Sequence, residues 1–124
     1  MRYLDSNIIA YAFYENENRE KCKELIKGEG IIDTFNLVEA YNIIQFETND
    51  KEYAKKVITS LLKSNLKIID VNINIIFEAL KRVEKYKNLK FLDLVHYTVA
   101  LLYSCNEIAS YDKDFDNLEI KRIT

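Results

Sequence analysis

Length, composition and charge exclude several classes of protein. The 124 residues suit a single domain, residues 1–124, built on one hydrophobic core. No run of about 18 uncharged apolar residues occurs, which excludes a membrane span, and the first residues lack the apolar run of a signal peptide, so we expect a cytoplasmic protein. The net charge of −2 is unlike that of proteins that bind nucleic acid through an overall positive charge.

The cysteine and histidine content excludes common zinc and nucleophile chemistries. Two cysteines stand far apart, Cys22 and Cys105, and His96 is the only histidine. A zinc site of thiolates and imidazoles is therefore nearly excluded. A Ser-His-Asp or Cys-His mechanism would need His96 as its base, and a core or hydrogen-bonded histidine is the stronger interpretation. If the chain has chemistry, carboxylates and a metal ion are its best candidates.

The first half of the chain predicts strands joined by helices. No proline and only two glycines are present, which disfavours tight hairpins. In chain order the apolar pattern predicts a strand, two short helices, a second strand and two longer helices, at residues 2–5, 7–14, 17–27, 31–34, from 36 onward and 50–63. Gly28 is expected to cap the second helix, and Asn49 with Glu52 has the spacing of a capping box.

The second half continues the same alternation. It predicts a strand, an amphipathic helix, a helix that is apolar on nearly every side and two further strands, at residues 66–71, 74–87, 92–104, 107–111 and 119–124. The order β-α-α-β-α-α-β-α-α-β-β is typical of the α/β class. We therefore expect a mostly parallel central sheet with helices on both faces.

Four acidic residues stand where such a sheet places its ligand sites. Asp5 and Asp112 each close a strand, and ligands of open parallel sheets bind at the carboxyl ends of strands. Glu39 and Asp93 lie in the first turn or so of helices. Asp93 is the most informative, because it begins the most apolar helix and a buried carboxylate needs a partner. Mg²⁺ or Mn²⁺ would be such a partner, and could bind a phosphate and activate water.

Each acid also has an ordinary structural interpretation. Glu39 could close a capping box with Asn36, and Asp93 could simply favour the positive end of its helix. Asp5 could be a cap or turn residue, and Asp112 could belong to a solvated turn. The presence of all four acids together, and not any single one, favours a metal site.

Four segments, in this order, resemble the acidic segments of PIN-domain nucleases. They are Tyr3-Leu4-Asp5-Ser6-Asn7-Ile8-Ile9, Asn36-Leu37-Val38-Glu39, Phe91-Leu92-Asp93-Leu94-Val95 running into Ala100, and Ser110-Tyr111-Asp112-Lys113-Asp114-Phe115-Asp116. The resemblance covers essentially the whole chain. It implies a three-layer α/β/α sandwich and a Mg²⁺- or Mn²⁺-dependent endoribonuclease that hydrolyses RNA phosphodiesters.

The resemblance also implies roles for individual residues. The catalytic acids would be Asp5, Glu39, Asp93 and Asp112. The metal ligands would be Asp5, Asp93 and Asp112, with Asp116 as an additional acid. Asn7 and Ser110 would support the cluster, Ser110 standing where threonine is the commoner choice. Short members are often VapC-type toxins that a small antitoxin keeps silent and that commonly form homodimers, so these partners are expected here.

Three alternatives remain open. A PIN-domain nuclease could process RNA in a housekeeping role. A receiver-like signalling domain would use Asp70 as phosphoacceptor and Lys121 as its partner, although such domains usually open with two adjacent acids and this chain has only Asp5 there. A partner-binding module could keep the fold without catalysis.

Overall fold

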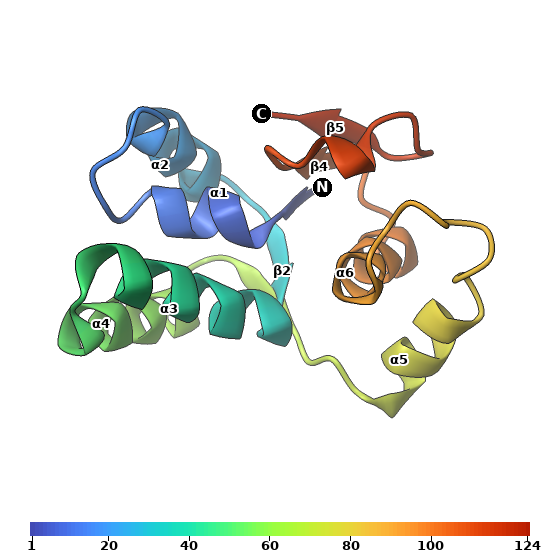
Figure 1. The fold of residues 1–124 in the computed structure, drawn as a ribbon, viewed down its shortest axis with the longest axis horizontal. Helices are drawn as coiled ribbons and strands as arrows, with labels where there is room; N and C mark the ends of the chain where they lie inside the picture. The colour runs from blue at the N-terminus through green and yellow to red at the C-terminus, as the bar shows by residue number, and fades with distance from the viewer.

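A five-stranded sheet runs through the protein, as seen in a computed structural model that describes residues 1–124 (Figure 1). The strands are β1 (Arg2–Leu4), β2 (Ile31–Asp33), β3 (Lys67–Ile69), β4 (Glu107–Ala109) and β5 (Lys121–Ile123). The helices are α1 (Ser6–Tyr11), α2 (Arg19–Lys27), α3 (Thr34–Thr48), α4 (Lys51–Leu62), α5 (Ile73–Leu80) and α6 (Phe91–Leu102), followed by the 3₁₀ turn η1 (Lys113–Phe115). The predicted order of elements is confirmed.

All neighbouring strands of the sheet are parallel. The spatial order is β3-β2-β1-β4-β5, so β1 lies at the centre and β3 and β5 are the edges. Leu4 pairs with Ala109 of β4, and Asp33 pairs with Ile69 of β3. The residues that follow β1, β2 and β4 therefore leave the sheet at one common edge, which is where a parallel sheet places ligands.

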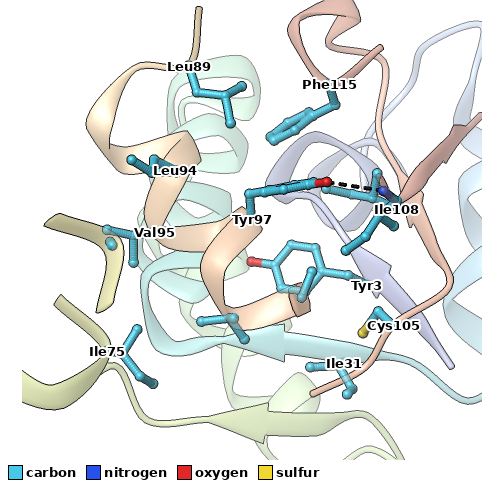
Figure 2. Close-up of a cluster of buried hydrophobic side chains, with 14 of the residues drawn as sticks. Tyr3, Ile31, Ile75, Leu89, Leu94, Val95, Tyr97, Cys105, Ile108 and Phe115 are labelled. Carbon is cyan, nitrogen blue, oxygen red and sulfur yellow. Dashed lines mark hydrogen bonds between the residues drawn. The ribbon is translucent and has the colours of Figure 1, made fainter. Parts of the chain in front are cut away.

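Alternating residues of the strands pack into two separate hydrophobic cores. Tyr3 and Ile108 face α5 and α6, whereas Leu4 and Ala109 face the core formed with α1 to α4. Figure 1 shows the two helical groups on opposite sides of the sheet, and Figure 2 shows Tyr3, Ile108 and Tyr97 packed together in the first core. Because a strand turns successive side chains to opposite faces, the result is the expected three-layer α/β/α sandwich.

Helix α3 begins at Thr34, earlier than predicted, because sequence spacing alone could not show which residue is its N-cap. Asp33 is its N-cap, and the carboxylate accepts hydrogen bonds from the backbone N–H groups of Phe35 and Asn36. The capping box therefore joins Asp33 and Asn36. The interpretation of Glu39 as the closing residue of a box with Asn36 is wrong, which leaves the Glu39 carboxylate without a capping role.

Two other local expectations need correction, and a third is confirmed. The N-cap of α4 is Asp50, which accepts from the N–H of Tyr53, while Asn49 ends α3 in a left-handed conformation at φ 51°. The expected box of Asn49 with Glu52 is therefore wrong. Gly28 is the C-cap of α2, as expected, although its backbone is extended and not left-handed as in the common glycine cap. The helix expected over residues 74–87 ends at Leu80.

Cys22 and Cys105 are both buried and unpaired. None of the helices combines the length and apolar character needed to cross a membrane.

Candidate active site

Asp5 is held firmly at the point where β1 passes into α1. It is the N-cap of α1, and its carboxylate accepts a hydrogen bond from the backbone N–H of Ser6 at 2.8 Å. The Ser110 hydroxyl donates to Asp5 Oδ2 at 2.6 Å, and the Asn7 side-chain amide donates to the same oxygen at 3.4 Å. Asp5 is buried, and this burial raises its pKa although the hydrogen bonds oppose the rise.

Ser110 connects Asp5 to Asp112. While its hydroxyl donates to Asp5, the same oxygen accepts from the backbone N–H of Asp112 at 2.9 Å. The Asp112 carboxylate then caps the 3₁₀ turn η1 by accepting from the N–H of Asp114. The ends of the two neighbouring strands β1 and β4 are therefore joined through one buried hydroxyl.

Asp93 lies in the first turn of α6, opposite these two acids. Burial is the largest cause that raises the pKa of Asp93 to about 6, followed by repulsion from Asp5 and then from Asp112. Glu39 adds to the repulsion, and His96 lessens it. The structure thus brings Asp5, Glu39, Asp93 and Asp112 within electrostatic reach of one another, and we call these four residues the acidic cluster.

Glu39 reaches the acidic cluster from the second turn of α3. Its Oε1 atom accepts a hydrogen bond from the Ser6 hydroxyl at 2.7 Å and lies 2.5 Å from His96 Nε2. Burial opposes ionisation of Glu39, but the bonds from His96 and Ser6 outweigh it and lower the pKa of this carboxyl. Glu39 is therefore a carboxylate at neutral pH.

His96 and Asp33 form a buried ion pair that the sequence interpretation missed. His96 Nδ1 donates to Asp33 Oδ2 at 2.7 Å, and both side chains are fully buried. Burial alone would lower the histidine pKa, but the hydrogen bonds with Asp33 and Glu39 raise the pKa of His96 to about 10. The ring is accordingly an imidazolium at neutral pH that donates to one carboxylate from each nitrogen.

Tyr3 and Asn36 complete this buried network. The Tyr3 hydroxyl lies 2.7 Å from Asp33 Oδ2 and 2.7 Å from Asn36 Oδ1. The Asn36 amide donates to the Ser6 hydroxyl, which itself donates to Glu39. One signal for the network was present in the sequence: Asp33 ends an apolar β-branched run, as Asp5 ends the first strand.

Asp116 is held outside the acidic cluster. Its carboxylate pairs with Arg122, with Nε and Oδ1 at 2.6 Å, and this ion pair lowers the pKa of Asp116. Arg122 also donates to the backbone carbonyl of Ser110. Asp116 is not among the acids whose charge raises the pKa of Asp93. Its expected place as an additional metal ligand stays a prediction.

The oxygen atoms at the acidic cluster match the preferences of a hard divalent cation. Carboxylates dominate the set, and Asn7 Oδ1 is buried beside Asp5 without a hydrogen-bond partner. Mg²⁺ and Mn²⁺ favour such oxygen ligands. No three His, Cys, Asp or Glu side chains stand close enough together to enclose an ion as they are arranged. The residue types therefore suit a divalent cation, but the side chains stand farther apart than the ligands of a bound ion.

Comparison with known families assigns the chain to a family. A family model of the PIN domain matches residues 2–121. The chain belongs to the PIN-domain family. A comparison with curated proteins finds no match.

Solved structures of VapC toxins share this PIN fold. The VapC20 toxin of Mycobacterium tuberculosis, which cleaves the sarcin-ricin loop, superposes with a TM-score of 0.81 at 13% identity, over 98% of this chain and 99% of that one. A toxin-antitoxin complex from Klebsiella pneumoniae superposes with a TM-score of 0.75 at 17% identity, over 100% of this chain and 97% of that one. VapBC2 of Rickettsia felis, bound to a DNA fragment of its promoter, has a TM-score of 0.73 at 19% identity, over 99% of this chain and 98% of that one.

The sheet order excludes the receiver-like alternative. Asp70 follows β3 and Lys121 begins β5, and these strands are the two opposite edges of the sheet. A phosphoacceptor and its lysine partner must share one site, so these two residues cannot form it.

Proposed function

We propose that this PIN domain is a cytoplasmic endoribonuclease that hydrolyses RNA phosphodiesters with the help of Mg²⁺ or Mn²⁺. The observation that carries the proposal is the convergence of Asp5, Asp112 and Glu39 on the half-buried Asp93, where Ser110 joins the ends of β1 and β4 and where burial and these charges raise the pKa of Asp93 to about 6. Acids from four separate parts of the chain crowd one site, and His96 offsets only part of the repulsion on Asp93. A divalent ion would remove the repulsion.

Asp5, Asp93 and Asp112 would hold the ion, with Asn7 Oδ1 as a neutral oxygen nearby. When bound, the ion supplies Lewis acidity toward a phosphate oxygen and lowers the pKa of an attacking water. Asp93 must lose its proton to become a ligand, and its raised pKa still leaves it mostly ionised at neutral pH. Without an ion the carboxylates repel one another and stand too far apart to enclose one. The proposal therefore includes a small inward movement of the carboxylates when the ion binds. Asp116 would join as a further ligand only after its release from Arg122.

The other residues of the site would orient the reacting groups. Ser110 would orient the Asp5 carboxylate relative to the backbone of Asp112 through its two hydrogen bonds. Glu39 is the fourth catalytic acid, with Oε1 held by Ser6 and His96. The Glu39 carboxylate therefore stands ready to accept a proton from a water or to orient it, as general-base chemistry requires.

We further propose that the chain is the toxin of a toxin-antitoxin pair and forms a homodimer. The toxin structures that share its fold support the first part. Exposed apolar side chains support both: Ile73, Phe77 and Leu80 project from one face of α5, and Val38 and Phe46 project from α3. Apolar side chains that are exposed together on one helix face can mark a contact with a partner. A small antitoxin and a second copy would cover it.

Cleavage assays test the nuclease proposal. Purified protein is incubated with RNA, with Mn²⁺ and with EDTA, and compared with Asp93→Asn. We expect cleavage only by the unaltered protein with Mn²⁺, and a loss of more than about 100-fold in the variant, because residues that merely support metal ligands already contribute 10–100-fold. Equal cleavage by both proteins, or cleavage in EDTA, would contradict the proposal.

A further inference from the structure

The only histidine of the chain joins two carboxylates from different elements. His96 comes from α6, Asp33 from the end of β2 and Glu39 from α3, so the three side chains link elements across the centre of the fold. His96 and Asp33 are fully buried, whereas the Glu39 side chain is 31% exposed. The pair Asp33–His96 is thus internal, and Glu39 is the member that faces the acidic cluster and solvent.

The hydrogen bonds on Glu39 are arranged to fix one of its oxygen atoms. Both Ser6 Oγ and His96 Nε2 contact Oε1, at 2.7 and 2.5 Å. A glutamate side chain has three rotatable bonds and loses considerable freedom when it is ordered. Two donors on a single oxygen favour one rotamer and leave Oε2 free of hydrogen bonds.

His96 is itself held in place from behind. Asp33 receives two backbone N–H groups, from Phe35 and Asn36, through its Oδ1 atom, and binds His96 through Oδ2. Oδ1 thus holds the start of α3, while Oδ2 binds His96 and also accepts a hydrogen bond from the Tyr3 hydroxyl. The ring is oriented by a carboxylate that the start of α3 has already immobilised, so its Nε2–H points in one direction only.

We propose that His96 is a positioning residue for RNA cleavage, which uses Asp33 as its anchor and fixes the carboxylate of Glu39 through the Nε2–H···Oε1 hydrogen bond. This inference rests on the proposed nuclease function. The raised pKa of His96 agrees with it, because only an imidazolium can donate to both acids at once. The arrangement has the form of the outer partners that orient ligands and acids in other active sites.

Two variants separate positioning from simple packing. In His96→Gln the side-chain amide takes the place of Nε2 and can still donate to Glu39, whereas in His96→Asn it takes the place of Nδ1 and can donate only to Asp33. Both variants lose the same charge and the same ring. We expect kcat of His96→Asn to fall about 10–100-fold below that of His96→Gln, with KM within about twofold.

The background of Glu39→Gln provides the control. If His96 acts through Glu39, adding His96→Asn to Glu39→Gln should cause no further loss of kcat. Equal kcat for the two His96 variants, a change confined to KM, or a further loss in the Glu39→Gln background would overturn the inference.

A measurement without RNA or metal decides the geometry separately. Because His96 is the only histidine, ¹⁵N-histidine labelling yields one imidazole ring in the NMR spectrum. At pH 7 we expect two slowly exchanging ring N–H protons, of which Glu39→Gln shifts the Nε2–H and Asp33→Asn the Nδ1–H. A ring with one N–H, or one that is unaffected by Glu39→Gln, would overturn the inference. If the hydrogen bonds are found but the unaltered protein cleaves no RNA, the nuclease proposal fails and the catalytic role of His96 fails with it.

Discussion

The two halves of the acidic region differ in how their charges are balanced. On one side, Asp33 and Glu39 share the buried imidazolium of His96, and every charged oxygen that faces the interior has a partner. On the other side, Asp5 and Asp112 have only neutral hydroxyl and amide donors, and the burial of Asp93 and its repulsion by Asp5 and Asp112 outweigh the opposing effect of His96.

This difference separates a half whose charges are paired within the protein from a half that the proposed function assigns to a metal ion. A buried carboxylate that is paired and hydrogen-bonded can be part of a stable core. A cluster of carboxylates without a cation costs stability, and such clusters occur where a ligand or metal supplies the missing charge. The half around His96 is therefore complete as folded, and under the proposed function the half around Asp93 would gain its balance from a bound ion.

The most direct way to break the complete half is to remove Asp33. The variant Asp33→Ala leaves the His96 imidazolium buried beside Glu39 alone, and it also removes the N-cap of α3. Breaking a buried ion pair from one side costs about 3–5 kcal/mol, so we expect a loss of that order in the free energy of unfolding, measured with urea. Asp70→Ala is the matched control, because Asp70 follows the neighbouring strand β3 but is exposed. If both variants lose equally, the buried pair contributes nothing.

The second prediction tests the charge of His96 by raising the pH. The pKa of His96 is raised in the folded state to about 10, above the 6.5 of the unfolded chain. The stabilisation from this group is thus fully present below pH 6.5 and is lost as the pH rises toward 10. Between these pH values we expect the free energy of unfolding, measured with urea, to fall by about a few kcal/mol more in the unaltered protein than in His96→Gln. Parallel stability curves for the two proteins would show that the histidine does not titrate in this way.

The third and smallest effect concerns Asp93 at acid pH. Its folded-state pKa of about 6 also lies above the unfolded value of 3.8, so protonation of Asp93 favours folding. This contribution is present below about pH 4 and is lost as the pH rises through 6. Without added metal, we expect Asp93→Asn to raise the melting temperature at pH 7.5 by a few degrees and at pH 4 by less, because Asp93 is only half-buried and solvent weakens the repulsion.

Mn²⁺ provides the control for that third prediction. An ion that binds the folded protein stabilises it in proportion to its affinity and concentration. We expect Mn²⁺ to raise the melting temperature of the unaltered protein and to have little effect on Asp93→Asn. The same rise in both would place the ion elsewhere than at Asp93.

The sequence by itself determined the class of fold and the elements that carry the acids. Apolar periodicity is a local property, so the order of strands and helices could be predicted, and parallel strands place Asp5 and Asp112 at one edge whatever the details. Helix starts were less predictable, because Asp33 competed with Asn36 and Asp50 with Asn49 for the same cap, and backbone geometry decided between residues one to three positions apart.

Only the tertiary structure decided the partners of His96. Its contacts join residues 33, 39 and 96, and nothing in the local pattern around any of them specifies the other two. The sheet order brings the end of β2 beside α6, and a buried charge must then find its counter-charge among whatever side chains the packing delivers. Local chemistry thus located the acids of this PIN domain, and packing across the sheet determined which of them received a cation from the protein.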